Sequence, residues 1–267
     1  MATAAFGEQR RDLSIGRIFE RSFQVIRAYP LQTLGVTFAL TTVPTILLRL
    51  VGMSAAWTTA LIRNPGGISY TSIVGGGLGI MLLWLVTYGA VTQVTLAQAD
   101  GRKPDLGEML TIGAKRSLPL LAVYLLYALA TTIGFALLIV PGIFLAVMWS
   151  IATTAVVAER PGVFGAFGRS AALTKGARWK VLGVLLVAFI LYMVIVMVGG
   201  VLTVASSGSL AALQTGVQPP FGFAQLVAML INTVALTWMM VLFAALFIEL
   251  REWKEGPDTD RLAEIFA

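Results

Sequence analysis

The chain has 267 residues, of which 58% are hydrophobic and only 12% charged, with a formal net charge of +6 and a mean hydropathy of +0.87. Since a soluble domain carries about 25% charged residues, this composition excludes a water-soluble globular fold and indicates an integral membrane protein. The sequence has no cysteine and no histidine. Disulfides are therefore excluded, and the commonest general base and metal ligand are missing.

An amphipathic helix is expected near the N-terminus, after a flexible polar segment at residues 1–11 and before Pro30, which ends it. One face of this helix comprises Ile15, Ile18, Phe19, Ser22, Phe23 and Ile26, and the opposite face comprises Arg17, Glu20, Arg21, Gln24 and Arg27. This pattern is typical of a helix lying in the membrane interface. A helix packed on another domain would show the same pattern, so that interpretation stays open.

Six apolar segments follow, each close to the ~20 residues that cross a ~30 Å hydrocarbon core. They cover about residues 31–52, 72–96, 118–140, 141–158, 181–206 and 223–250. The third and fourth are almost contiguous, so Pro141-Gly142 is expected to form a tight turn between them. In the second, Gly75 and Gly79 have the GxxxG spacing that lets helices approach closely. We treat residues 12–250 as one membrane domain and 251–267 as a cytoplasmic tail.

Two further short amphipathic helices are predicted between the spans. Asp105 and Glu108 have the spacing of a capping box, ahead of a helix that ends near Lys115-Arg116. A later helix is expected between Pro161, which suits a first helical position, and Gly176, which suits the residue past the end. Its apolar side comprises Val163, Phe164, Phe167 and Ala171.

Parts of this layout repeat along the chain. Arg21-Ser22 and Leu34-Gly35-Val36 recur 148 residues later as Arg169-Ser170 and Leu182-Gly183-Val184, and Lys115-Arg116-Ser117 is a fainter third copy. The predicted fold is therefore all-α and polytopic, with six transmembrane helices and about three short amphipathic interfacial helices. We interpret it as a three-fold repeat of an interfacial helix followed by a two-span hairpin.

The distribution of cations predicts the orientation. With six spans, 17 of the 19 cationic residues fall on the side of both termini, and only Arg49 and Arg63 fall on the other. The 17 are Arg10, Arg11, Arg17, Arg21, Arg27, Arg102, Lys103, Lys115, Arg116, Arg160, Arg169, Lys175, Arg178, Lys180, Arg251, Lys254 and Arg261. Because cytoplasmic loops carry an excess of Lys and Arg, both termini are expected in the cytoplasm.

The segment PGIFLAVMWSIATTAVVAERPGVFGAFGRSAALTKGARWKVLG, together with the close from Glu249-Leu250-Arg251 to Lys254-Glu255-Gly256, resembles the membrane domain of bacterial glycerophosphoryl diester phosphodiesterases. That domain also occurs alone, in six-span membrane proteins. The resemblance extends over most of the chain and implies a location in the bacterial cytoplasmic (inner) membrane. In the fused enzymes a separate soluble barrel performs the hydrolysis with histidines and acidic metal ligands. Because this sequence has no histidine and no such barrel, the resemblance does not carry the activity over.

Little in the sequence points to catalysis, and we predict no catalytic residue, cofactor or metal site. Asp258 and Asp260 form a DxD motif, but in a charged tail that we interpret as solvated. Ser117 and Ser170 lie near lysines, yet without histidine the usual activation of a serine nucleophile is missing. The chain is therefore expected not to be an enzyme.

Candidate lipid contacts are the cations of the first and last interfacial helices and of the residues just beyond. They are Arg17, Arg21, Arg27, Arg169, Lys175, Arg178 and Lys180. Each cation near an anionic leaflet contributes about 1 kcal/mol. Some of them could instead pair with Glu20, Glu108 or Glu159 and serve packing. Inside the membrane, the candidate polar contacts are Arg49, Gln93 and Asn232.

These observations favour a non-enzymatic membrane module that interacts with lipid or scaffolds a partner. Its expected partners are membrane lipids with anionic headgroups and a second membrane protein, with no nucleic acid. One alternative is a component of a small-molecule or lipid transporter, which a polar cavity lined by Gln93, Asn232 and the threonines would favour. Another is an accessory membrane domain acting with a glycerophosphodiester-metabolising enzyme.

Overall fold

The computed structural model of the chain describes residues 13–50, 70–207 and 222–256, and these residues form helices and turns without any strand. Six helical stretches are long and apolar enough to cross a membrane. They are Leu31–Leu48, Gly77–Ala99, Leu106–Leu137, Ile139–Ala158, Arg178–Ala205 and Phe223–Glu255. The lengths and compositions of these helices are those of a multi-pass membrane protein, as predicted from the sequence.

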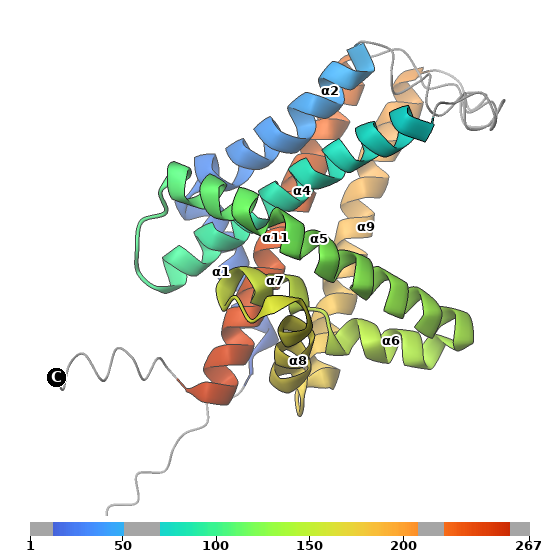
Figure 1. Cartoon of the computed structure of the whole chain (residues 1–267). Helices are drawn as coiled ribbons and strands as arrows, with labels where there is room; N and C mark the ends of the chain where they lie inside the picture. Colours follow the sequence, from blue (N-terminus) through green and yellow to red (C-terminus); the bar gives the residue numbers. More distant parts are fainter. Residues whose placement is uncertain (1–12, 51–69, 208–221, 257–267) are drawn as a thin grey trace, which may run out of the picture.

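The helices form one bundle around the last of them (Figure 1). In chain order they are α1 (Ile15–Ala28), the π-helical segments η1 (Leu31–Gly35) and η2 (Phe38–Thr42), α2 (Val43–Leu50), α4 (Tyr70–Ala99), α5 (Leu106–Leu137), α6 (Ile139–Met148), α7 (Ala152–Ala158), α8 (Gly162–Thr174), α9 (Arg178–Ser207) and α11 (Phe223–Glu255). Helix α11 runs from one end of the bundle to the other, and its C-terminal end lies at the same end as the start of α1. The end of α2 and the start of α4 lie at the opposite end.

The first span is partly π-helical and rich in threonine. The hydroxyls of Thr33, Thr37, Thr41 and Thr45 each donate to the backbone carbonyl four residues earlier. Such bonds compete with the backbone ladder and bend helices, which fits the π winding here. The Thr42 hydroxyl lies 2.5 Å from that of Thr233 on α11. Hydroxyl pairs of this kind hold helices together inside a membrane.

Helices α4 and α5 cross closely at a pair of buried glycines. A Cβ added to Gly89 would lie only 2.9 Å from the Cα of Gly113, so neither position has room for a side chain. The close approach predicted at the GxxxG spacing is wrong for Gly79, which is exposed and has no atom within 4 Å of a Cβ built on it. The surroundings of Gly75 lie outside the described part of the chain.

Two boundaries predicted around the third and fourth spans are wrong. The short helix expected to end near Lys115-Arg116 continues through Pro119 as α5, so it is not a separate interfacial helix. Asp105 does cap it, since its Oδ2 accepts the Glu108 N–H at 2.9 Å. The turn falls at Leu138, and Pro141-Gly142 lies within the start of α6. Proline is tolerated there because the first N–H groups of a helix have no intrahelical partner.

The fourth span is interrupted between α6 and α7, and α8 satisfies the backbone at this break. The carbonyl of Met148 accepts hydrogen bonds from Ser170 Oγ at 2.9 Å and Thr174 Oγ1 at 3.3 Å. Irregular backbone at membrane depth is stable only when its polar groups are paired within the protein. Helix α8 begins one residue after Pro161 and ends just before Gly176, which has a φ of 91°. Both ends therefore lie close to the predicted positions.

The last helix is longer than predicted. Helix α11 continues to Glu255, five residues into the segment expected to be the tail. This extension carries Glu252, Lys254 and Glu255, which contact α1 and α8 as described below. The rest of the predicted tail, and residues 1–11, lie outside the described residues.

Candidate functional site

Two carboxylates near the end of α11 hold α1 by ion pairs. Arg17 reaches Glu249 with an N–O distance of 2.6 Å, and Arg21 reaches Glu252 at 2.9 Å. The side chain of Glu249 is only 4% exposed. A buried carboxylate without a cation is strongly destabilising, so the contact with Arg17 is what allows Glu249 to sit in this helix contact.

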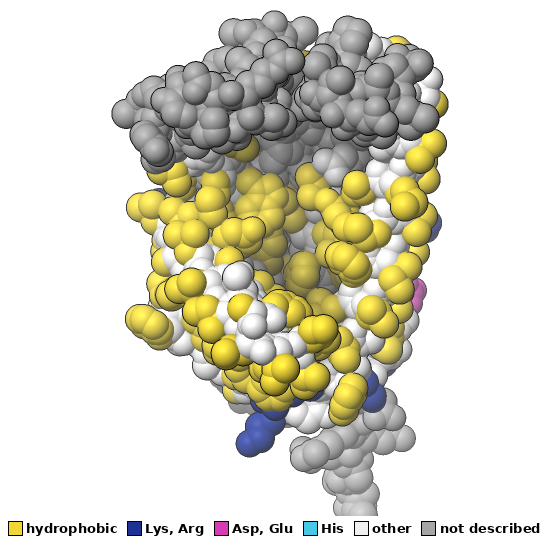
Figure 2. All heavy atoms as spheres, turned by 90° about the vertical axis from the view of Figure 1, so that its right-hand side faces the viewer, with side chains coloured by type: hydrophobic (Ala, Val, Ile, Leu, Met, Phe, Trp, Pro, Cys, Tyr) yellow, Lys and Arg dark blue, Asp and Glu magenta, His cyan; other side chains and the backbone are white. Residues whose placement is uncertain are grey.

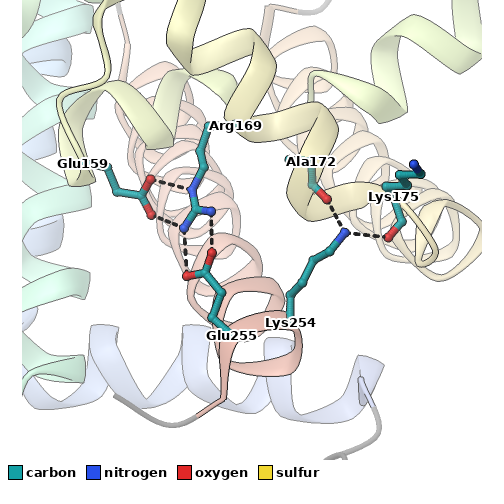
Figure 3. Close-up of polar contacts among 6 residues, drawn as sticks. All are labelled: Glu159, Arg169, Ala172, Lys175, Lys254 and Glu255. Carbon is teal, nitrogen blue, oxygen red and sulfur yellow. Dashed lines mark hydrogen bonds and ion pairs between the residues drawn. The ribbon is translucent and has the colours of Figure 1, made fainter. Parts of the chain in front are cut away.

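A third carboxylate of α11 holds α8 (Figure 3). The guanidinium of Arg169 donates to Glu159 from Nε at 2.5 Å and from Nη2 at 2.6 Å, and also to Glu255 at 2.9 Å. Hydrogen bonds to Glu255 and then to Glu159 raise the pKa of the Arg169 guanidinium above its ordinary value. Lys254 donates to the backbone carbonyls of Ala172 and Lys175 at the end of α8. We call Arg17, Arg21, Arg169, Glu249, Glu252 and Glu255 the α11 collar.

Contacts of an aromatic side chain beside the collar also hold α1 against α11. Trp238 donates its indole N–H to the hydroxyl of Ser22 at 3.1 Å, and both side chains are buried. The rings of Phe19 and Phe23 each lie 6.0 Å from that of Trp238, measured between centroids. Ile18, Ser22 and Val25 are the buried residues of α1. The bundle, mainly α11, thus covers part of the apolar face of α1, while Ile15 and Phe23 on the same face are exposed.

The remaining candidate lipid contacts have other surroundings. Arg178 places its Cζ 4.6 Å from the centre of the Phe144 ring, and Lys180 donates to the carbonyl of Leu13 at 3.3 Å. Arg27 and Lys175 have exposed side chains. None of these four cations forms an ion pair with a carboxylate among the described residues. They differ in this from Arg17, Arg21 and Arg169.

Of the three candidate intramembrane polar residues, the structure describes the side chains of two, and no hydrogen bond joins these two. Gln93 is half-buried on α4, and Asn232 is exposed on the outer side of α11. Arg49 lies on α2, but its side chain is outside the described part. The span threonines are mostly buried between helices; Thr33, Thr37, Thr87, Thr92 and Thr237 are fully covered. The polar cavity that would have favoured a transporter is not formed by these residues.

A different cavity of about 250 Å³ lies among α4, α5, α9 and α11, beside the break between α6 and α7. Its lining residues are Trp84, Leu85, Tyr88, Tyr124, Tyr127, Ser150, Thr153, Tyr192, Leu236, Met239, Met240 and Phe243. None of them is charged, and six carry aromatic rings, which come from α4, α5, α9 and α11. Trp84 packs against Tyr88 and Tyr124, with ring centroids 5.9 and 5.5 Å apart. The wall is therefore largely apolar and aromatic.

The cavity is partly open, on the face formed by α9 and the α5–α6 turn. Helix α4 packs along α5, and α9 packs along α11, whereas α5 and α9 do not pack along each other. Figure 2 shows this face covered with hydrophobic side chains and hollowed at its centre. Exposed apolar residues occupy both neighbouring helices, for example Leu129 on α5 and Phe189 on α9. The opening therefore faces sideways, toward the medium around the spans.

The sequence analysis missed this cavity. Four of the six tyrosines line it, namely Tyr88, Tyr124, Tyr127 and Tyr192. Tyrosines in membrane proteins concentrate at the interfaces, so tyrosines near the middle of three different spans were a usable signal. Their convergence still depended on the packing of α4, α5 and α9.

Comparisons with known proteins returned no match for this chain among family models, curated proteins or solved structures.

Proposed function

We propose that the chain is a non-enzymatic module of the bacterial cytoplasmic membrane that binds membrane lipid. The observation that carries the proposal is the uncharged, aromatic-lined cavity that opens sideways between α5 and α9. Ligand sites are typically concave and mostly apolar, with a few polar groups. A site that opens toward the bilayer receives its ligand from the bilayer. The lack of histidine in the sequence supports a binding role rather than catalysis.

The cytoplasmic face of this module consists of α1, α8 and the α11 collar, with both termini on that side. Helices α1 and α8 each carry an Arg-Ser pair whose serine is fully buried and whose arginine pairs with α11. This likeness supports two copies of a unit made of an interfacial helix and a hairpin, and in the third copy the helix is fused to its span as α5. Lys175 and Arg178, which have no carboxylate partner among the described residues, are the cations best suited to anionic headgroups.

The resemblance to the membrane domain of glycerophosphoryl diester phosphodiesterases supports a second candidate role as an accessory domain for an enzyme that acts on lipid-derived substrates. Lipid binding is common to both roles. The transporter alternative has less support, because neither Gln93 nor Asn232 is among the residues that line the cavity.

Native mass spectrometry of the protein purified in a mild detergent tests the proposal. We expect at least one bilayer lipid to remain bound to the folded protein after detergent exchange, and delipidation to lower the thermal stability. Protein that carries no lipid and is equally stable after exhaustive delipidation would contradict it. A co-purifying enzyme of glycerophosphodiester metabolism would add the accessory role.

A further inference from the structure

The cavity among α4, α5, α9 and α11 has the chemistry and size of a site for one hydrocarbon chain. We infer that it holds the end of a single acyl chain of a bilayer lipid, which enters sideways between α5 and α9. This inference rests on the proposed lipid-binding function and names the part of the lipid that is bound.

The lining excludes a charged headgroup. All twelve lining residues are uncharged, so a phosphate inside the cavity would lack a cation and lose its hydration, which is strongly unfavourable. The hydroxyl of Tyr88 is already engaged, at 3.0 Å from Thr153 Oγ1 and 2.9 Å from Thr154 Oγ1. Because this hydroxyl contacts α7, Tyr88 presents its aromatic ring to the cavity. An apolar occupant therefore fits the wall better than a polar one.

The volume sets how much of a lipid can enter. An apolar cavity of about 150 Å³ accepts benzene, which has six carbons. In proportion, a cavity of about 250 Å³ takes roughly ten carbons. That is the terminal part of one acyl chain. Two chains, or a whole phospholipid, would not fit, so the rest of the lipid would lie along the outside of the bundle.

The depth of the cavity agrees with a chain end. Tyr192 follows the start of α9 at Arg178 by 14 residues, which is about 21 Å along the helix axis at 1.5 Å per residue. Leu236 lies at a similar distance, about 20 Å, from the start of α11 at Phe223. Both lie near the middle of helices that cross a ~30 Å core. Chain ends of membrane lipids lie at this depth, and the headgroups do not.

The exposed apolar faces of α5 and α9 are consistent with an acyl chain entering the cavity from the side. Leu125 and Leu129 on α5, and Phe189 and Met193 on α9, are exposed apolar side chains. In a bilayer these side chains contact acyl chains. A mostly apolar cavity that opens beside them offers water few hydrogen-bond partners and is filled by a chain instead.

A photocrosslinking experiment with a matched pair of variants tests the inference. The probe is a phosphatidylglycerol that carries a diazirine at the end of one acyl chain, reconstituted with the full-length protein in vesicles. Leu236→Trp adds bulk to the cavity wall. Leu230→Trp makes the same change on the same helix at a position that is 49% exposed and does not line the cavity. Leu236→Phe is a milder filling variant, for use if Leu236→Trp does not fold.

We expect crosslinks to peptides containing Tyr124, Tyr127 and Tyr192 that unlabelled lipid suppresses. They should fall at least fivefold in the Leu236 variant and stay unchanged in the Leu230 variant. Equal crosslinking in the wild type, the Leu236 variant and the Leu230 variant, with lipid still retained in native mass spectra, would overturn the proposed acyl-chain site. The proposed lipid-binding function would remain. Absence of any retained lipid would overturn both. If the protein retained an amphiphile built of fused rings and the acyl probe gave no crosslink, the ligand would not be an acyl chain and the inference would be wrong.

Discussion

Arg169 on α8 and Glu255 in the last turn of α11 lie face to face, with Nη2 2.9 Å from Oε2, although they are 86 residues apart in the chain. The same guanidinium is bidentate to Glu159 at the end of α7. One cation thus bridges two carboxylates from different helices. It fixes α8 against both the broken fourth span and the central helix.

Removing this cation should loosen the contact between α8 and α11. We expect Arg169→Gln to lower the free energy of unfolding in detergent by about 1 kcal/mol, a modest value because these groups are partly exposed. Adding Glu255→Gln to that variant should restore part of the loss, because one of the two uncompensated carboxylates is removed. The coupling is measured by a double-mutant cycle. Lys175→Gln, at the exposed end of α8, is the control, and strict additivity in the cycle would show that the pair contributes nothing.

Charge removal should separate the cations that pack helices from those that contact lipid. We expect Lys175→Gln/Arg178→Gln to reduce the phosphatidylglycerol retained per protein, most clearly at low salt, because screening acts within about 8–10 Å. The matched variant Arg17→Gln/Arg21→Gln should lower stability with little change in retention, because Glu249 and Glu252 already neutralise those charges. Bound lipid is counted by mass spectrometry over a range of salt. Equal loss of lipid from both variants would show that the ion pairs of the collar do not exclude lipid contact.

The purified protein is expected not to hydrolyse glycerophosphodiesters, with or without added divalent metal. The physical reason is that the sequence supplies no histidine as a general base or metal ligand. Release of glycerol 3-phosphate is the measurement. Metal-dependent turnover that co-elutes with the protein through successive columns would contradict this expectation, and the protein would then have to be classed as an enzyme.

The sequence was most informative where the structural cause was local. Pro161 and Gly176 marked both ends of α8 to within a residue, and Asp105 caps α5 as its spacing from Glu108 predicted. The helix end predicted near Lys115-Arg116 is wrong, because α5 continues through that point and through Pro119 without a break. Helices in a bilayer tolerate proline because neighbouring groups satisfy the freed backbone.

The sequence could not predict contacts between residues that are far apart in the chain, and the reason is different. Glu159, ten residues from Arg169, was named as a candidate partner, but Glu249 lies 232 residues from Arg17 and was not. The same applies to the cavity, whose tyrosines come from three helices. Their meeting depends on the packing of α4 against α5 and of α9 against α11, which amphipathic patterns do not encode when every face of a span is apolar.

The arrangement of the helix ends predicts the side on which each loop lies. The start of α1 and the end of α11 lie together at one end of the bundle, which requires an even number of crossings and places both termini on the same side. We expect reporters fused after residue 210 and after residue 267 to report opposite sides of the membrane, with the second in the cytoplasm. Two reporters on the same side would contradict a crossing of the membrane by α11.

The turn between α5 and α6 should remain inside the hydrocarbon region. Leu137, Leu138, Ile139 and Val140 are each about 70% exposed or more, and the turn contains no polar side chain. Exposing four large apolar side chains to water would cost several kcal/mol, since full burial of each is worth about 1.5–3 kcal/mol. The bilayer is therefore the more stable surrounding for this turn.

Spin labelling tests this placement, and the absence of native cysteine makes single-cysteine variants straightforward. A nitroxide on Leu138→Cys should be readily accessible to oxygen and poorly accessible to a water-soluble nickel chelate. A nitroxide on Lys103→Cys, in the exposed connection between α4 and α5, should show the reverse. High nickel accessibility at position 138 would mean that the hairpin emerges into water. Its exposed apolar turn would then need a protein partner to cover it.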